Sequence, residues 1–521
     1  MSTSRLVGGL ILFLALCLGA CSAPAAPPPP QASPSAALPS DSPALPTLTI
    51  PAPPTPAPPA PSATPQPPDP ALLPPAAYNL DTVLDFARHS LSVAESIDYP
   101  NRGQQALDDL LLVVEPNRWE GAFRLQSLLW ADGSAVQDYT LETNLLRIPL
   151  PAPLLPGERL QLSLAYTLEL PPVHQTADSF SVDPFGYTAC PANLTDLFAE
   201  CQLNLVDWYP IVPPYDPVNG WLAHADWFFG EHQVYEAADV QVALSLAEPV
   251  EGLVIAASAP AAQQGERLVY QIQGARNLVF SISPLFQMQS AAVDGITVTS
   301  YYFAHHQAAG EMALQNTLEA LALYNQRFGA YPYPSLSVVE ADFADGMEYS
   351  GLYFLSGDFY NLYNGTPSSY LTAIAAHETA HQWWYGTVGN DQALEPWLDE
   401  SLCTYTERLF YETYYPDALR WWWDYRINYY QPQGLLNQSI YDYAGYRPYR
   451  DAVYLNGARF LEDLRTLIGD EAFFAFLADY ASQRAGQIAT TSDFFAILKE
   501  HTRADLSPLL AEYFGASENL P

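Results

Sequence analysis

The spacing of apolar residues in the first half of this chain limits the folds open to it. Before about residue 290, apolar and polar residues alternate, as in RLQLSLAYTLEL (159–170) and DVQVALSL (239–246). A period of two is typical of half-buried antiparallel strands. Turn residues separate these stretches, so we predict an antiparallel β-sandwich-like domain over 77–290.

After this point the spacing becomes helical. Residues 308–328 place apolar side chains mainly three or four apart, and Gly329 predicts the end of a helix there. A strand-turn-strand stretch follows, and helical patterns then continue to the end of the chain. We therefore predict a multidomain β plus α+β protein, whose second domain spans 291–521 and finishes in helices.

The first 21 residues have the features of an export signal. Their apolar run, 6–18, is too short to span a bilayer and follows an arginine. It ends in Leu-Gly-Ala-Cys, which resembles a bacterial lipobox and implies that Cys21 becomes lipidated. Ordinary signal-peptide cleavage after Ala20 is the alternative. The expected location is extracytoplasmic, with the protein lipid-anchored to a bacterial membrane.

A proline- and alanine-rich segment follows the signal. Residues 22–76 are nearly uncharged and cannot form a core. We predict a semi-rigid linker that holds the rest of the chain away from the membrane.

The net charge of the chain limits the classes of partner that it can bind. Its net charge is −37, with 49% hydrophobic and 13% aromatic residues. So acidic a chain argues against nucleic acid and anionic membrane surfaces as partners, since both are negatively charged. We therefore expect membrane contact through the lipid anchor only.

Two cysteines, Cys190 and Cys201, lie eleven residues apart in CPANLTDLFAEC. In an oxidising compartment this arrangement predicts a local disulfide.

The segment SSYLTAIAAHETAHQWWYG is predicted to be a helix that Ser368 or Ser369 caps and Gly386 ends. Residues four apart lie on one face of a helix. His377 and His381 therefore point in the same direction and can bind one metal ion.

Two glutamates complete a candidate metal site. Glu378 lies next to His377, where it can reach a water molecule on the metal. Eighteen residues separate His381 from Glu400, which falls near the start of a second helix in which Pro396 suits the first turn. A catalytic zinc ion needs a third protein ligand of this kind and an open position.

The spacing HExxH-x18-E resembles that of the M1 family of zinc aminopeptidases, which are gluzincins. Trp384 and Thr387 stand where a metzincin would have its glycine and third histidine. FADGMEYSGL (343–352) looks like the GAMEN segment of the M1 family, and AVYLNGARFL (452–461) resembles its Tyr-x-Lys-Gly stretch. The resemblance covers about 90–521 and implies a thermolysin-like catalytic domain after the β domain.

The resemblance also implies roles for single residues. It makes one Zn²⁺ the cofactor, Glu378 the general base and Tyr454 the hydroxyl that stabilises the oxyanion. Glu348 would bind the free amine of a peptide substrate. The implied metal ligands are His377, His381 and Glu400, and Gly346 and Met347 would border the substrate beside Glu348.

Some assignments stay open at this point. Nearby tyrosines are alternatives to Tyr454, namely Tyr441, Tyr443, Tyr446 and Tyr449. Asp399 and Glu407 either support the metal ligands or belong to solvated helix faces.

The chain also departs from the family pattern. Tyr349 replaces the asparagine of GAMEN, Gly346 replaces its alanine, and Asn456 replaces the lysine of Tyr-x-Lys-Gly. We expect the amine site to differ in shape.

The expected function is zinc-dependent removal of N-terminal residues from peptides. The alternatives are an endopeptidase or a hydrolase of a non-peptide substrate such as an epoxide, on the same scaffold. A tethered binding protein with an inactive site is the alternative from another class.

Overall fold

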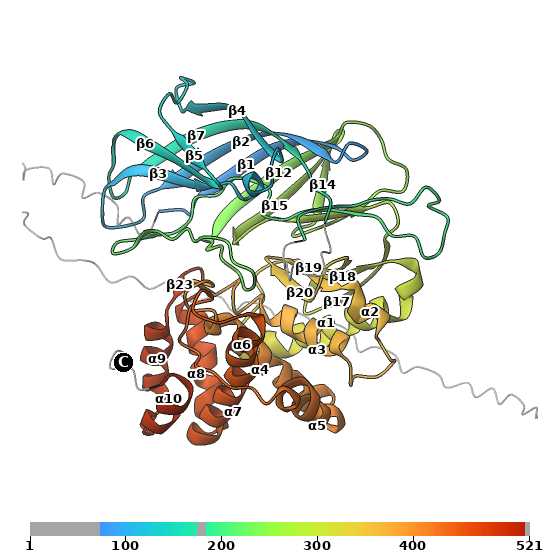
Figure 1. The fold of residues 1–521 in the computed structure, drawn as a ribbon, viewed down its shortest axis with the longest axis vertical. Coiled ribbons are helices and arrows are strands. Elements are labelled where there is room, and N and C mark those ends of the chain that lie inside the picture. Colours follow the sequence, from blue (N-terminus) through green and yellow to red (C-terminus); the bar gives the residue numbers. More distant parts are fainter. Residues whose placement is uncertain (1–72, 174–183, 516–521) are drawn as a thin grey trace, which may run out of the picture. The chain divides into compact units, whose positions relative to one another are not determined.

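The computed structural model describes residues 73–173 and 184–515, all within one compact unit, Gln66–Pro521. Among the described residues, the regular elements are mainly strands before about residue 300 and mainly helices after it, as the sequence predicts (Figure 1). The predicted signal peptide with Cys21 and the linker up to residue 72 lie outside the described residues.

A seven-stranded sheet dominates the N-terminal domain. Its order is β14-β15-β12-β1-β2-β7-β4, and its strands pair antiparallel except for β1 with β12. The predicted alternation is confirmed in β7, where Leu162, Leu164, Tyr166 and Leu168 are buried. The strands are β1 (Ala77–Asp85), β2 (Ser90–Pro100), β4 (Phe123–Trp130), β7 (Arg159–Glu169), β12 (Ala238–Leu246), β14 (Ala261–Gln264) and β15 (Arg267–Ala275).

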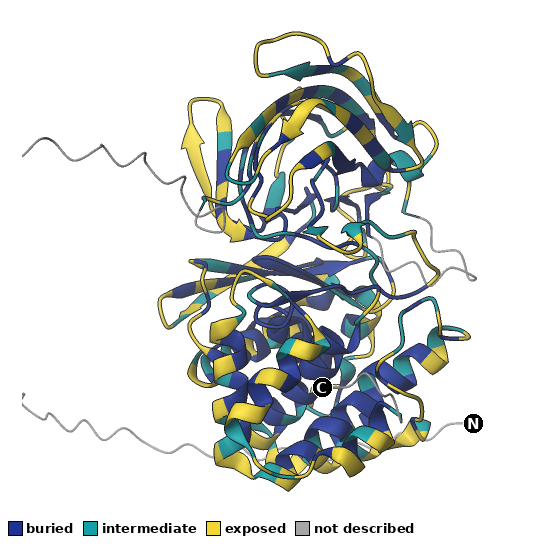
Figure 2. Cartoon of the chain, turned by 90° about the vertical axis from the view of Figure 1, so that its left-hand side faces the viewer, coloured by how far each residue is buried: buried dark blue, intermediate teal, exposed yellow. Residues whose placement is uncertain are grey.

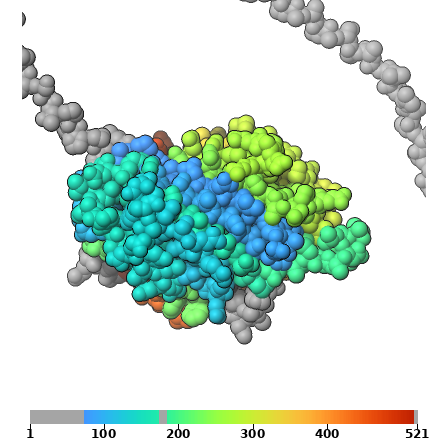
Figure 3. Space-filling model, turned by 90° about the horizontal axis from the view of Figure 1, so that it is seen from above, coloured from blue at the N-terminus to red at the C-terminus, as the bar shows by residue number. Residues whose placement is uncertain are grey.

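Smaller sheets pack against this one and share its core, which makes the domain sandwich-like as predicted. Most of the face seen in Figure 3 belongs to this domain, coloured blue to green. The smaller sheets contain β3 (Leu107–Val113), β5 (Thr140–Glu142) and β6 (Leu145–Leu154), then β8 (Gly186–Thr188), β9 (Gln202–Leu205), β13 (Val254–Ala257) and β16 (Phe280–Ser283), and the pair β10 (Tyr215–Asp216) and β11 (Gly220–Trp221).

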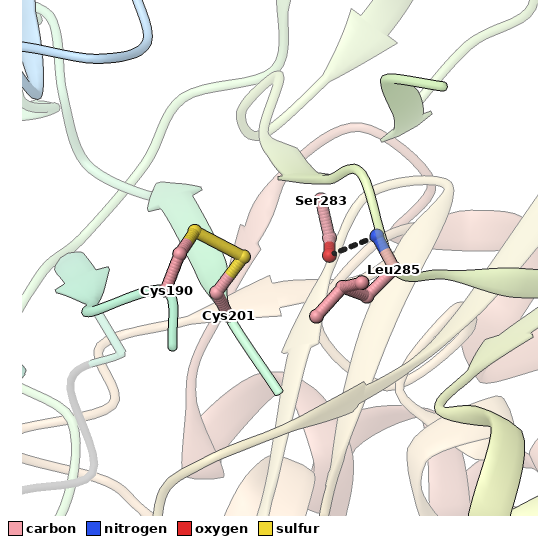
Figure 4. The surroundings of a disulfide bond; sticks show 4 residues. All are labelled: Cys190, Cys201, Ser283 and Leu285. Carbon is pink, nitrogen blue, oxygen red and sulfur yellow. Dashed lines mark hydrogen bonds between the residues drawn. A yellow bond between two sulfur atoms is a disulfide. The ribbon is translucent and has the colours of Figure 1, made fainter. Parts of the chain in front are cut away.

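Cys190 and Cys201 form a disulfide bond between β8 and the start of β9 (Figure 4). The bond closes the loop between two neighbouring strands of the small sheet.

The C-terminal domain begins with a five-stranded sheet in the order β17-β18-β19-β21-β20. Its strands are β17 (Gln287–Val293), β18 (Ile296–Tyr302), β19 (Ser335–Ala341), β20 (Gly346–Tyr349) and β21 (Leu352–Ser356). The predicted domain boundary at 290 therefore falls inside β17, which pairs with β18 along its whole length. Period-two patterning does not distinguish the last strand of one sheet from the first strand of the next.

Helices α1 (Gln307–Phe328) and α3 (Tyr370–Ala380) pack on this sheet (Figure 1). The predicted helix over 308–328 is confirmed to within one residue, and Gly329 follows it with a φ of 104°. Every residue of α3 after Tyr370 is buried, in keeping with the dark blue interior of the helical layer in Figure 2.

The remaining elements are mostly helical. Among the described residues, no helix combines the length and apolar composition that crossing a membrane requires. The α-helices are α2 (Gly357–Asn361), α4 (Trp397–Tyr414), α5 (Leu419–Trp421), α6 (Tyr446–Arg450), α7 (Gly457–Ile468), α8 (Asp470–Gln483), α9 (Thr491–His501) and α10 (Ser507–Tyr513). The π-helix η5 (Trp422–Ile427) lies before α6, and the π-helix η7 (Asp451–Asn456) directly follows α6. Strand β22 (Gly389–Asn390) pairs with β23 (Ile488–Ala489). The 3₁₀ turns are η2 (Glu115–Arg118), η3 (Ala304–His306), η4 (Pro416–Ala418) and η6 (Asn428–Tyr430).

Candidate metal centre

Helix α3 carries the two histidines of the predicted site. Ser369 caps it by accepting a hydrogen bond from the backbone N–H of Thr372, as predicted. The helix ends at Ala380, with His381 as its C-cap, and not at Gly386 as predicted. The reason is a wide turn, in which the N–H of Gly386 donates to the carbonyl of His381 at 2.8 Å.

Three predicted ligand atoms converge between α3 and α4. The Nε2 atoms of His377 and His381 are 3.1 Å apart, and Oε2 of Glu400 lies 3.1 Å from the first and 3.5 Å from the second. Glu400 occupies the first turn of α4, after Pro396 at the N-cap. All three side chains are buried.

The other ring nitrogens of both histidines have partners. Nδ1 of His377 lies 2.9 Å from Oε1 of Glu407, and Nδ1 of His381 lies 3.0 Å from the carbonyl oxygen of Trp384. Because these partners are acceptors, each Nδ1 carries the proton. Each Nε2 is then left with a lone pair for a metal.

The donor set fits tetrahedral zinc. Two atoms bound to one tetrahedral zinc ion at about 2.0–2.1 Å are about 3.3–3.4 Å apart. The three distances observed here, 3.1, 3.1 and 3.5 Å, match this spacing. A cation bound between the two Nε2 atoms would pair with both lone pairs, and two nitrogens with one carboxylate oxygen are ligands that zinc accepts.

Two acidic residues accept hydrogen bonds from the predicted metal ligands. Glu407 is fully buried and accepts hydrogen bonds from Trp422 and, twice, from Arg426 as well as from His377. Asp399 is also buried and accepts a hydrogen bond from the backbone N–H of Glu400. The alternative that these residues lie on solvated helix faces is therefore wrong.

Glu378 lies beside the donor set with a free carboxylate oxygen. Its Oε2 is buried and has no hydrogen-bond partner among the described residues. Burial, with repulsion from Glu348 and Glu400, raises the pKa of Glu378 to about 8 when no metal is bound. Gly346 packs directly against it, because a Cβ there would lie 2.1 Å from Oε1 of Glu378. The glycine that replaces the GAMEN alanine therefore makes room for this carboxylate.

Tyr454 reaches the site from η7. Its hydroxyl donates to Oε1 of Glu400 at 2.6 Å. Close helix packing places it there: the Ser401 hydroxyl donates to the carbonyl of Val453 at 2.5 Å, and a Cβ at Gly457 would lie 2.0 Å from Oγ of Ser401.

The alternative tyrosines are placed differently. Tyr449 packs edge-on against the ring of Tyr454 at 5.7 Å, and Tyr446 donates to Asp345. Tyr441 and Tyr443 donate to backbone carbonyls of Ala225 and Leu435.

Glu348 lies on β20, at the edge of the five-stranded sheet. Its Oε1 is 3.8 Å from Nδ1 of His381 and accepts a hydrogen bond from Gln392. With Met347 and Tyr349, it lines a cavity beside the metal ligands.

A further carboxylate, Glu231, lines the same cavity and was not predicted. Its Oε2 is buried and has no hydrogen-bond partner among the described residues. Burial and the negative charges of Glu400 and Glu348 raise the pKa of Glu231 well above its usual value. It comes from the β domain, 117 residues before Glu348 along the chain, so no local pattern could associate the two.

Part of this chain is similar in sequence to known aminopeptidases. Residues 312–513 match the Peptidase family M1 domain. The chain is 25% identical over 244 residues to Aminopeptidase M1-A of Oryza sativa subsp. japonica, and 27% identical over 235 residues to Aminopeptidase M1 of Arabidopsis thaliana. These alignments cover 43% and 42% of this chain and 27% of each relative, so the chain matches about a quarter of their length.

Solved structures share the fold. The crystal structure of an M1 zinc metallopeptidase mutant from Deinococcus radiodurans bound to a Tyr-Ser-Ala substrate superposes with a TM-score of 0.60. It is 18% identical, and the match covers 85% of this chain and 95% of that one. A crystal structure of M1 zinc metallopeptidase from Deinococcus radiodurans gives a TM-score of 0.59. The β domain followed by an α+β domain ending in helices is therefore the two-domain architecture of these proteins.

Proposed function

Because residues 312–513 match the Peptidase family M1 domain, we propose that the chain is an aminopeptidase that removes N-terminal residues from peptides. One observation carries this proposal: the buried carboxylate of Glu348 lies 3.8 Å from the metal-binding histidine His381. A carboxylate at this position can bind the ammonium group of a peptide whose first peptide bond lies at the metal.

Zinc held by His377, His381 and Glu400 would supply Lewis acidity, which lowers the pKa of a water molecule and polarises the scissile carbonyl. Glu378 takes a proton from the attacking water through its unpartnered Oε2 and passes it to the leaving amine. The neighbouring histidines favour the charged form of this carboxylate, and bound zinc adds to that effect.

The hydroxyl of Tyr454 stabilises the oxyanion of the tetrahedral intermediate. Its hydroxyl donates to Glu400 in this structure, so it lies at the edge of the ligand set. A small rotation of the side chain directs it toward a carbonyl oxygen that faces the metal. There it stabilises the negative charge that develops in the transition state.

Glu231 and Glu348 place two buried carboxyl groups at the amine site, and burial raises the pKa of both. The two groups line one cavity, and the negative charge of Glu348 raises the pKa of Glu231 and of Glu378. An ammonium group placed between them relieves this repulsion. Preference for a free N-terminus follows from the same charge balance.

We also propose that the protein works outside the cytoplasmic membrane, anchored through lipid on Cys21. The Leu-Gly-Ala-Cys sequence after a short apolar run supports this location. The disulfide between Cys190 and Cys201 also suits an oxidising compartment. Metabolic labelling with a radioactive fatty acid, lost in Cys21→Ala, tests the anchor.

The aminopeptidase proposal is tested with matched peptides that carry a free or an acetylated N-terminus. We expect the purified, zinc-loaded chain to cleave only the free peptide. Glu348→Gln should lower kcat/KM for that peptide by about 10- to 100-fold, because a charge-assisted hydrogen bond to the amine is lost.

Each other outcome has a different meaning. Equal cleavage of both peptides would make the protein an endopeptidase. Zinc binding without cleavage of either peptide would leave the non-peptide hydrolase or the inactive binding protein. An unchanged kcat/KM in Glu348→Gln would remove Glu348 from the amine site.

Replacing Tyr454 with phenylalanine is expected to lower kcat by about 100- to 1,000-fold with little change in KM, as for loss of one oxyanion donor. Steady-state kinetics on the free peptide measures both constants. Tyr443→Phe is the matched control, since its hydroxyl bonds to the Leu435 carbonyl away from the ligands. Equal losses in the two variants would contradict the assignment.

A further inference from the structure

Residue Tyr385, four positions after His381, has a backbone conformation that needs external support. Its φ is 127°, in the region that only glycine adopts readily. It follows Trp384, whose carbonyl oxygen accepts the hydrogen bond from Nδ1 of His381. The strained residue therefore lies next to the group that orients a metal ligand.

The support comes from two consecutive residues of the β domain, Arg276 and Asn277, between β15 and β16. Both are buried, at 3% and 2% exposure. The side-chain amide of Asn277 donates to the Tyr385 hydroxyl at 2.7 Å. Its carbonyl oxygen accepts a hydrogen bond at 3.0 Å from the N–H of Ser350, which follows the strand carrying Glu348.

The guanidinium of Arg276 is surrounded by backbone carbonyls. It donates to those of Tyr235, Tyr385, Gly386, Thr387 and Gln487 at 2.9 to 3.4 Å. Three of these acceptors are consecutive residues of the wide turn after His381. A Cβ at Gly389 would lie 2.8 Å from Cζ of Arg276, so glycine there makes room for the guanidinium.

We propose that Arg276 and Asn277 are positioning residues for the metal ligand His381. They hold Tyr385 in its strained conformation and thereby fix the Trp384 carbonyl against Nδ1 of His381. The hydrogen bond to that carbonyl sets the tautomer and ring orientation that leave Nε2 pointing at Glu400 and His377. The β domain therefore contributes to metal binding without supplying a ligand.

This role differs from general cohesion between the domains. A residue that only joined the domains would stabilise the fold without changing the affinity for metal of the molecules that remain folded. Arg276 and Asn277 instead act on the geometry of one ligand. Loss of a group that orients a ligand typically weakens metal binding by about 10- to 100-fold.

The chain offers a matched control in Gln202. This residue is 2% exposed, lies on β9 of the β domain and donates to the backbone carbonyl of Glu340 in the catalytic sheet at 3.0 Å. Its side chain also bonds to Ser281. Neither partner belongs to the turn over 381–388. Gln202 is therefore like Arg276 in being buried and in joining the β domain to the catalytic domain, but it does not contact that turn.

The test is a zinc titration of the full chain in competition with a chromogenic chelator. We expect Arg276→Lys and Asn277→Ala to weaken zinc binding about tenfold or more, and Gln202→Ala to change it less than about twofold. The melting temperature of each zinc-free variant separates loss of stability from loss of affinity. Tyr385→Phe, which removes only the hydroxyl that Asn277 contacts, keeps the test open if the other variants do not fold.

Two results would overturn the inference. One is wild-type zinc affinity in Arg276→Lys, Asn277→Ala and Tyr385→Phe. The other is an equal loss of affinity in Gln202→Ala. The inference rests on the zinc site of the proposed function but not on peptide hydrolysis. Wild-type protein that binds zinc without cleaving peptides would end the aminopeptidase proposal and leave this one standing.

Discussion

Replacing Glu378 with glutamine is expected to lower kcat by about 100- to 10,000-fold while zinc stays bound. Glutamine has nearly the same shape and fits against Gly346, but it cannot accept a proton from the attacking water. The variant keeps His377, His381 and Glu400, so the metal site is retained. The kcat on a free-amine peptide and the zinc content of the purified variant are the two measurements.

Glu340→Gln provides a matched control. Glu340 is another buried glutamate of the same domain, hydrogen-bonded to His306 and to the backbone N–H of Phe303. Its replacement alters a buried carboxylate without touching the donor set. If Glu378→Gln retained wild-type kcat, or lost its activity only together with its zinc, the assignment of Glu378 as general base would be wrong.

Removal of zinc by a chelator is expected to abolish hydrolysis completely, and added zinc should restore it. Without the cation, the Nε2 atoms of His377 and His381 have no metal ion to bind. The fold should also lose stability, because zinc at 100 times its Kd adds about 2.7 kcal/mol to the free energy of unfolding. Activity and melting temperature are followed together during depletion and reconstitution.

The same chelator saturated with zinc beforehand is the control for direct inhibition. Chelator-treated protein that is shown to contain no zinc and still hydrolyses the peptide would exclude the metal mechanism. A melting temperature that did not change on depletion would contradict selective binding of zinc to the folded chain, because such binding must raise the free energy of unfolding.

Short-range patterns predicted much of the fold. The helix over 308–328 needed only apolar spacing and a terminal glycine, and Ser369 begins α3 as its sequence indicates. The end of α3 was missed, because the turn after Ala380 is closed by bonds between residues five apart. Such a turn has no distinct composition, so the sequence pattern indicates Gly386 as the end of the helix.

The two histidines of the metal site could also be predicted from a short-range pattern. His377 and His381 are one helical turn apart, so helix geometry alone brings them together. Glu348 and Tyr454 were reached through motifs that resemble the M1 family. Their distances to His381 and Glu400 follow from packing that the motifs do not describe.

The sequence by itself predicted a β domain followed by an α+β domain, and a helix that carries His377 and His381 on one face, because these features depend on residues near one another along the chain. Only the tertiary structure brought Glu231 to the cavity that Glu348 lines, and Arg276 to the turn after His381. Both come from the β domain and reach the site through sheet packing. Contacts between residues more than a hundred positions apart leave no periodic signal, so they appear only when the chain is folded.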